Sequence, residues 1–311
     1  MAEHTLTAEP THSRWNRALE PRLVIATGDT VHMECVDATG GQVRPGMTVE
    51  EFQTIDRGRV HALTGPIFVR GADVGDVLQV DVLKVAHKGW GWSSVIPGLG
   101  FLKERFAEPY LFHWELEGEV SKSMAPATVP LRPFCGVMGV APGQDGEFRT
   151  RPPGAFGGNM DVRELHSGAT LYLPVLNSGA LFSAGDAHAA QGDGEVCING
   201  IECPADVTLR FRVHKRRSLA GPMIESAAPK DDADGDAWIV VESTTDAIAA
   251  ARAATSRMID LLVERWGLRD VHAYLLCSVA MNLRLSQVVN EPMYTVSAAI
   301  AKKVLPGRKL F

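Results

Sequence analysis

The sequence predicts a mainly β protein, in which a β-sandwich or barrel-like, jelly-roll-like body precedes a C-terminal α+β portion. Residues 21–243 contain many short apolar segments separated by Gly and Pro. Short strands with such turns are typical of sandwiches and barrels. After residue 243 the pattern changes to that of a long helix. We therefore expect an N-terminal arm over 1–20, a β-rich body over 21–243 and an α+β portion over 244–311 that packs on the body.

Three predicted strands of the body begin with a glycine. They are GDTVHMEC (28–35), GDVLQVDV (75–82) and GATLYLPV (168–175). Gly permits a turn, and the β-branched run that follows suits a pleated, half-buried surface. The same criteria predict further strands over 67–70, 112–120, 134–140, 196–203, 207–213 and 237–243.

The C-terminal portion begins with a predicted helix that Thr245 or Asp246 caps and Gly267 ends. Apolar residues recur at helical spacing along it, which indicates a face packed on the core. The pattern then predicts a second helix over 269–280 and a strand over 281–289, while 293–304 fits either state.

The composition is that of an ordinary globular protein, because 45% of the 311 residues are hydrophobic and 22% are charged. A net charge of −6 argues against nucleic acid or an anionic membrane surface as a partner. No apolar run reaches the roughly 20 residues that a membrane helix needs, and the polar N-terminus lacks the apolar core of a secretory signal. Five scattered cysteines without a CxxC motif predict reduced thiols and a cytoplasmic protein.

The segment GWGWSSVIPGLGFL (89–102) is apolar and aromatic, yet four glycines and a proline interrupt it. It is therefore predicted to be a loop. Apolar loops are usually covered, so one interpretation is packing in the core or at a subunit contact. The other is that Trp90, Trp92 and Pro97 form a wall of a small, dry pocket, since ligand sites are mostly apolar.

The stretch LFSAGDAHAAQGDGE (181–195) concentrates groups that can bind a metal between residues with almost no side chain. Asp186 and His188 are two residues apart, and in an extended segment such residues point to the same side. They could therefore grip one divalent cation. Glu195 is expected to open the next strand and to return near the same place, with Gln191 as a second choice.

Other parts of the chain could supply further groups to such a site. Two glycines precede Asp161 in GAFGGNMDVREL, so the backbone can approach closely there. Glu34 and Asp37 lie in VHMECVDATGGQV, and His61 precedes a Thr-Gly-Pro turn. Each also has a structural interpretation, as a hydrogen-bonded core histidine or as an ordinary turn residue.

Taken together, several blocks of the chain resemble the acetamidase/formamidase family of amide hydrolases. The resemblance covers roughly residues 20–300, and it rests on the order of GDTVHMECVDATGGQ, HALTGPIFVRGADVGDVLQVDV, GWGWSSVIPGLG, PPGAFGGNMDVRELHSGATLYLPV and GDAHAAQGDGEVC. It implies a mainly β fold, hydrolysis of short amides to acid and ammonia, a homo-oligomer (dimer or tetramer) and a divalent metal, zinc foremost. Some members act on small lactams. Residues 198–201 read Ile-Asn-Gly-Ile, where small residues and Thr are expected in relatives.

On this resemblance, we assign Asp161, Asp186 and His188 as ligands of the metal, because a mixed nitrogen and oxygen set suits zinc. Zinc would assist amide hydrolysis in two ways, since it acidifies the attacking water and polarises the amide carbonyl. Glu195 would act as general base and then as general acid. His61 would donate to the developing oxyanion or hold a ligand in place. Second-choice ligands or orienting residues are Glu34, Asp37 and Gln191.

Two alternatives stay open. One is a hydrolase without a metal that uses an activated Cys135, Cys197 or Ser183, or a hydrolase of small lactams. The other is a β-sandwich binding protein in which the acidic segment holds a structural cation and no catalysis takes place.

Overall fold

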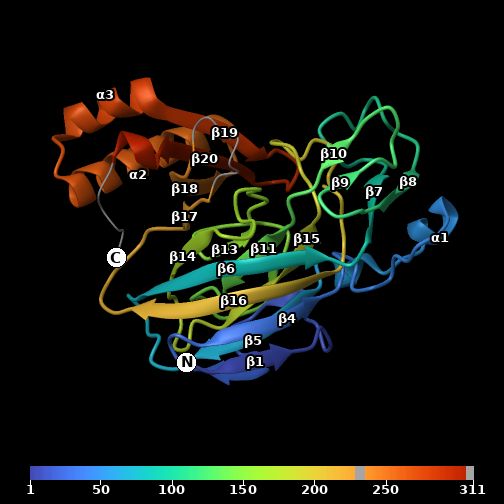
Figure 1. The fold of residues 1–311 in the computed structure, drawn as a ribbon, viewed down its shortest axis with the longest axis horizontal. Coiled ribbons are helices and arrows are strands. Elements are labelled where there is room, and N and C mark those ends of the chain that lie inside the picture. Colours follow the sequence, from blue (N-terminus) through green and yellow to red (C-terminus); the bar gives the residue numbers. More distant parts are fainter. Residues whose placement is uncertain (228–234, 306–311) are drawn as a thin grey trace.

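Two β-sheets packed face to face form the body of the protein (Figure 1). The structure is a computed structural model, and it describes residues 1–227 and 235–305. The larger sheet has nine strands, in the spatial order β1 (Glu3–Leu6), β4 (Thr30–Cys35), β16 (Ala205–His214), β6 (Val77–His87), β14 (Thr170–Pro174), β17 (Met223–Glu225), β18 (Ala237–Thr244), β20 (Tyr294–Ala301) and β19 (Met281–Gln287).

The smaller sheet has five strands, in the order β13 (Gly157–Asn159), β11 (Phe134–Val140), β15 (Phe182–His188), β5 (Leu63–Val69) and β3 (Leu23–Ile25). Short strand pairs extend the body, and they are β9 (Val120–Ser121) with β10 (Val129–Pro130), β2 (Arg14–Trp15) with β12 (Phe148–Arg149), and β7 (Trp90–Val95) with β8 (Tyr110–Glu115). The helical elements are α1 (Val49–Gln53), α2 (Ala247–Trp266), α3 (Asp270–Ala280) and the 3₁₀ turns η1 (Arg57–Arg59) and η2 (Lys302–Val304).

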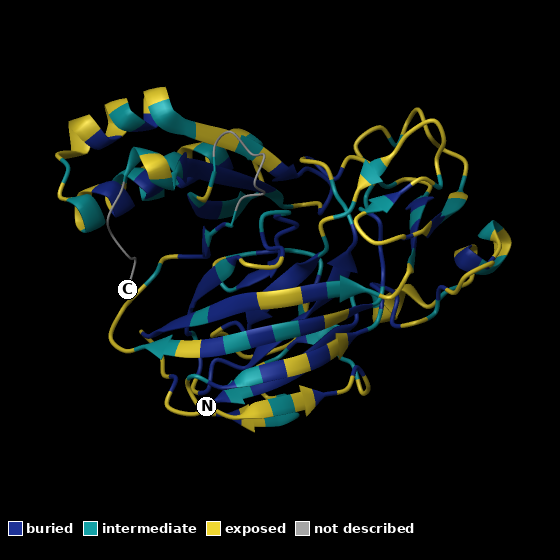
Figure 2. Ribbon diagram, in the orientation of Figure 1, coloured by how far each residue is buried: buried dark blue, intermediate teal, exposed yellow. Residues whose placement is uncertain are grey.

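The main hydrophobic core lies between the two sheets, where Phe182 of β15 meets Phe211 of β16 edge-to-face at 5.2 Å between ring centroids. On β4, buried and less buried residues alternate, as expected for a strand with one face on the core. Every residue of β11 and β15 is buried instead (Figure 2). Polar side chains at the end of β15 are therefore held in the interior by close packing on both sides.

The C-terminal helices cover the far end of the nine-stranded sheet (Figure 1). The Asp246 side chain accepts a hydrogen bond from the Ala249 amide at 2.6 Å, and Gly267 ends α2 in the left-handed conformation at φ 71°. The buried face of α2 forms a second core with β18 and β20. The predicted fold class is thus confirmed: the protein is mainly β with a C-terminal α+β portion.

The C-terminal strands continue the sheet of the body. β20 pairs with β18, and β19 pairs with β20 at the sheet edge. The segment 293–304, which fitted either state, forms β20 and η2. Residues 306–311 of the predicted C-terminal portion lie outside the described residues. At the other end, β1 in the predicted N-terminal arm pairs in parallel with β4. None of the described helices is long and apolar enough to cross a membrane.

Two sequence predictions were wrong. No strand forms over 196–203, and Glu195 does not open one, because the backbone turns at Glu195 (φ 48°) and at Ile198 (φ 80°). The segment 89–102 is only partly a loop, because its first half is strand β7. Gly91 explains the error: a Cβ there would lie 2.7 Å from the carbonyl oxygen of Glu202, so the glycine permits a close strand approach rather than a turn.

Packing of the buried face of α2 is expected to stabilise the C-terminal portion. Leu262 is fully buried there, so Leu262→Ala is expected to lower the free energy of unfolding by about 2–5 kcal/mol. Ile248 on the same helix is 63% exposed, and Ile248→Ala should change it by less than about 0.5 kcal/mol. Denaturant titrations measure both values. Equal midpoints for the two variants would contradict this packing.

Candidate functional site

The end of β15 carries two polar side chains into the interior, those of Asp186 and His188, and both are buried. Asp186 Oδ1 lies 3.7 Å from His188 Nε2, so the two side chains share one side, as their spacing predicted. The ring of Phe134 packs edge-on against the imidazole at 5.3 Å between centroids. The pair is therefore fixed in place by the core.

Three further carboxylates converge on this pair from distant parts of the chain. Ligand atoms of Asp161, Asp186 and His188 lie within 4.8 Å of one another, and so do those of His188, Glu195 and Glu202. Within the second group, His188 Nε2 lies 2.9 Å from Glu202 Oε1. All five side chains are buried. We call this group the acidic cluster.

The backbone takes an unusual course at the acidic cluster. Asp161, Asp186 and Glu195 have φ angles of 50°, 54° and 48°, the left-handed region that residues with a side chain seldom adopt. Each such residue costs on the order of 1–3 kcal/mol and is maintained only by its surroundings. Three strained acidic residues at one point indicate a functional site.

Gly136 of β11 makes room for the carboxylates. A Cβ at this position would lie 2.4 Å from Asp161 Oδ1 and 3.0 Å from Asp186 Oδ2. No side chain fits there without moving these groups. The bare backbone of β11 thus forms one wall of the acidic cluster.

Gln191 orients the histidine. Its amide nitrogen donates to the carbonyl oxygens of Asp161 at 2.9 Å and Ser286 at 3.2 Å, so its oxygen must face His188 Nδ1, which lies 2.8 Å away. Because that oxygen can only accept, Nδ1 carries a proton and Nε2 is turned toward the carboxylates. On the other side, Asn290 Nδ2 donates to Asp161 Oδ2 at 2.6 Å.

Several buried polar atoms of the acidic cluster have no hydrogen-bond partner among residues 1–227 and 235–305. They are Asp161 Oδ1, His188 Nε2, Glu195 Oε2 and Glu202 Oε2, together with the neighbouring Asn159 Oδ1. The close approach of His188 Nε2 to Glu202 has the distance of an ion pair but not the alignment of a hydrogen bond. Buried polar atoms are almost always paired, so a group of unpaired acceptors points to a missing positive charge.

The pKa values of the carboxyl groups also indicate that a positive charge is missing. Burial raises the pKa of Asp161 to about 7 and that of Glu202 to about 8, and burial together with Asp161 raises the pKa of Glu195. Burial opposes ionisation of Asp186 as well, but His61 and His188 outweigh it and lower its pKa to about 2. These carboxyl groups cannot all ionise together unless a cation compensates their charge; otherwise some of them retain a proton.

The residues of the acidic cluster therefore fit a divalent metal ion. An imidazole nitrogen and several carboxylate oxygens are a mixed set, which suits zinc or another first-row ion better than calcium or magnesium. Asp161, Asp186, His188 and Glu202 could serve as ligands. Sequence reasoning missed Glu202 because it lies in the segment 196–203 that was predicted to be a strand. A lone carboxylate between Ile201 and Cys203 was the available signal.

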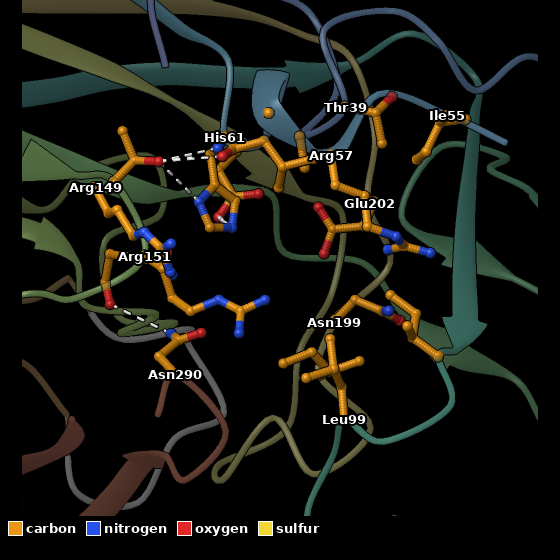
Figure 3. A pocket seen from close by; sticks show the side chains of 18 of the residues that line it. Thr39, Ile55, Arg57, His61, Leu99, Arg149, Arg151, Asn199, Glu202 and Asn290 are labelled. Carbon is orange, nitrogen blue, oxygen red and sulfur yellow. Dashed lines mark hydrogen bonds and ion pairs between the residues drawn. The ribbon is translucent and has the colours of Figure 1, made fainter. Parts of the chain in front are cut away.

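A cavity of about 420 Å³ opens onto the acidic cluster (Figure 3). Asp186, Glu195 and Glu202 line its inner end, together with His61, whose Nε2 lies 3.9 Å from Asp186 Oδ2. Burial lowers the pKa of His61. The His61 amide donates to Thr150 Oγ1 at 3.0 Å, which fixes this segment at the cavity wall.

Part of the predicted aromatic wall faces this cavity. Trp92 lines it together with Ile96 and Leu99 from the same segment, whereas Trp90 and Pro97 are not among its lining residues. The Trp92 indole nitrogen donates to Asp37 Oδ2 at 2.8 Å. Asp37 thus positions a wall residue and lies outside the acidic cluster. Glu34 is half-exposed and lies 4.0 Å from Lys88, so it is also remote from the acidic cluster.

The alternative nucleophiles do not line this cavity. A hydrogen bond with Cys35 and burial raise the pKa of the Cys135 thiol, and burial raises that of Cys197. Both thiols are therefore poor sources of thiolate at neutral pH. Ser183 Oγ is 2.9 Å from His12 Nε2, a contact expected of an activated serine, but neither residue lines the cavity.

Comparison with known proteins gives consistent matches. A model of a family described as Acetamidase/Formamidase matches residues 2–147 and 144–306. The crystal structure of an acetamidase from Bacillus halodurans superposes with a TM-score of 0.89 at 33% identity, covering 96% of this chain and 98% of that one. The sequence is 28% identical to a formamidase from Methylophilus methylotrophus and 27% identical to an acetamidase from Mycolicibacterium smegmatis. Those alignments cover 61% and 62% of this chain and 60% and 63% of the two relatives, slightly less than two thirds of their length.

Substitution of Gly136, whose backbone adjoins the carboxylates, tests the acidic cluster. Gly136→Ala places a methyl group against Asp161, so we expect a loss of about 1–3 kcal/mol in stability from overpacking. Zinc affinity should fall by about 10- to 100-fold, the usual effect of disturbing the support of a metal ligand. Calorimetric zinc titration measures this. Gly143→Ala is the control, since a Cβ there meets its nearest atom at an ordinary 3.4 Å. Equal zinc affinity in both variants would refute the role of Gly136.

Proposed function

The chain belongs to the acetamidase/formamidase family, and from this premise we propose that it hydrolyses short-chain amides to a carboxylic acid and ammonia with a divalent cation, zinc foremost, in the acidic cluster. The observation that carries the proposal is a group of buried carboxylate and imidazole atoms that have no hydrogen-bond partner among the described residues and lie at the inner end of a cavity of about 420 Å³. Family membership supplies the reaction, and the acidic cluster supplies groups suited to it.

The ligands we propose are Asp161, Asp186 and His188, with Glu202 as an additional one. When bound, the cation would acidify a water molecule and polarise the amide carbonyl. Gln191 keeps the Nε2 atom of His188 directed at the carboxylates, and Asn290 holds one oxygen of Asp161. These two amides restrain the ligands before the cation binds, which lowers the cost of assembling the site.

Glu195 is the proposed proton carrier. It lines the cavity, and its Oε2 atom has no hydrogen-bond partner among the described residues. It would take a proton from the attacking water and deliver one to the departing nitrogen. The carbon–nitrogen bond breaks, a carbon–oxygen bond forms, and ammonia leaves. His61 would donate to the developing oxyanion or hold Asp186, which it faces across the cavity end.

The apolar side of the cavity would exclude water from the reacting groups. Trp92, Ile96 and Leu99 form part of this side, and Trp92 is fixed by Asp37. A dry pocket strengthens the electrostatic interactions of the charged groups at its inner end.

We also propose a homo-oligomer, a dimer or tetramer, in the cytoplasm. Strand β19 is an edge of the nine-stranded sheet and exposes Leu283 and Leu285, and α3 beside it exposes Tyr274 and Val279. An apolar open edge favours association with another chain. The five cysteines are all free thiols, which favours a reducing compartment.

Removal of the metal tests the proposed cofactor. Dialysis against a strong chelator should abolish ammonia release from acetamide and formamide, and added Zn²⁺ should restore it, because the acidic cluster alone supplies no cation to activate water. Metal analysis of the same batch gives the zinc content per chain. Full activity in protein that contains no metal would overturn the metal-dependent part of the proposal.

Substitution of the proton carrier tests its role separately. Glu195→Gln should lower kcat by about 10²- to 10⁴-fold while zinc stays bound, because the amide cannot accept the proton of water. Glu34→Gln, at a half-exposed glutamate outside the acidic cluster, is the matched control and should keep wild-type kcat. Steady-state ammonia release measures both variants. Undiminished turnover in Glu195→Gln would remove Glu195 from the mechanism.

A further inference from the structure

The cavity is larger and more basic than a neutral two-carbon amide requires. Its volume of about 420 Å³ lies in the range of sites for considerably larger ligands. Four arginines line it, namely Arg14, Arg57, Arg149 and Arg151. A neutral amide offers no charge for them to recognise. The function proposed above therefore leaves these arginines unexplained.

The arginines are arranged at a cost to the fold. Arg149 of β12 is paired directly with Arg14 of β2 in an antiparallel register. Like charges directly opposite each other on neighbouring strands destabilise the pair. Arg151 follows two residues later, and Figure 3 shows Arg149 and Arg151 on the side of the cavity opposite Leu99 and Asn199. Two of the four arginines, Arg149 and Arg151, thus lie together on one wall of the cavity, which we call the arginine wall.

No carboxylate of the described residues forms an ion pair with an arginine of this wall. The guanidinium groups of Arg57, Arg149 and Arg151 form no ion pair or hydrogen bond with described residues, although that of Arg57 lies over the Phe52 ring at 5.7 Å. Among the described residues, the guanidinium of Arg14 donates only to the carbonyl oxygen of Ser13, at 2.8 Å.

The electrostatic neighbours of Arg151 are unfavourable. Burial lowers its pKa first, and the positive charge of Arg149 lowers it further. Glu291 and Glu195 act in the opposite direction. Neither carboxylate forms an ion pair with Arg151, however: Glu291 is paired with Lys103 at 3.1 Å, and Glu195 belongs to the acidic cluster. An anion bound at this wall would relieve the repulsion between the arginines.

We propose that the preferred substrate is the monoamide of a short dicarboxylic acid, whose free carboxylate is bound by Arg149 and Arg151. This inference rests on the amidase function proposed above. The planar guanidinium groups match a carboxylate in two-point geometry. The carboxylates at the inner end repel the anionic end of such a molecule and leave the uncharged amide to face them. The apolar side chains of Ile96, Leu99 and Ile198 then cover the methylene groups. Water replaces the amide nitrogen, so the products are the dicarboxylate and ammonia.

The experiment compares kcat/KM of the zinc-loaded enzyme for succinamate, its uncharged methyl ester and acetamide. Succinamate should exceed the ester by at least about tenfold, the usual worth of a hydrogen bond to a charged group. This preference should shrink as salt is raised, because the arginine wall is partly exposed. Hydrolysis of acetamide without preference for succinamate would overturn this inference and leave the amidase function standing. Absence of hydrolysis of all three would overturn both.

Variants identify the residues responsible. Arg149→Gln and Arg151→Gln should each reduce the ratio of kcat/KM for succinamate to that for the ester by about tenfold, mainly through KM. Arg151→Lys should retain part of the ratio because it keeps the charge. Arg252→Gln, on the exposed face of α2, is the control and should keep the wild-type ratio. An unchanged ratio in both cavity variants would refute the assignment of the arginines.

Discussion

The gathering of four buried carboxylates around one imidazole is the interaction on which the rest of the site depends. Separately, burial would keep each carboxyl group neutral, and together they repel one another. Only a positive charge held among them makes the arrangement favourable, and Gln191 prepares for it by turning His188 Nε2 inward. The left-handed backbone at Asp161 and Glu195 is the conformational cost of bringing these groups together.

The sandwich supplies the rigidity that this arrangement requires. β11 and β15 are buried along their whole length, so Asp186 and His188 cannot relax away from their neighbours. The bare backbone of Gly136 lets the carboxylates approach β11. Away from this acidic inner end, the charge of the residues that line the cavity is positive at the arginine wall. The two ends together would define the direction in which a polar substrate enters.

Much of the fold and part of the site could be predicted from the sequence. The spacing of Asp186 and His188 predicted a shared side because the period of an extended strand is local, and the cap and end of α2 are local signals as well. Glu202 was not predicted, because its position depends on the left-handed turns at Glu195 and Ile198 rather than on a repeating pattern. Arg149 and Arg151 carry no motif, and their importance appears only when β12 pairs with β2 beside the cavity. The roles of the ligands and of the proton carrier remain predictions.

The most direct test of this account is a crystal of the protein grown with Zn²⁺ and measured on both sides of the zinc absorption edge. We expect an anomalous peak between His188 Nε2 and the carboxylates of Asp161, Asp186 and Glu202, with Glu195 facing the open side. A zinc-dependent enzyme whose anomalous peak lies elsewhere, with these carboxylates unchanged and without an ion, would contradict it.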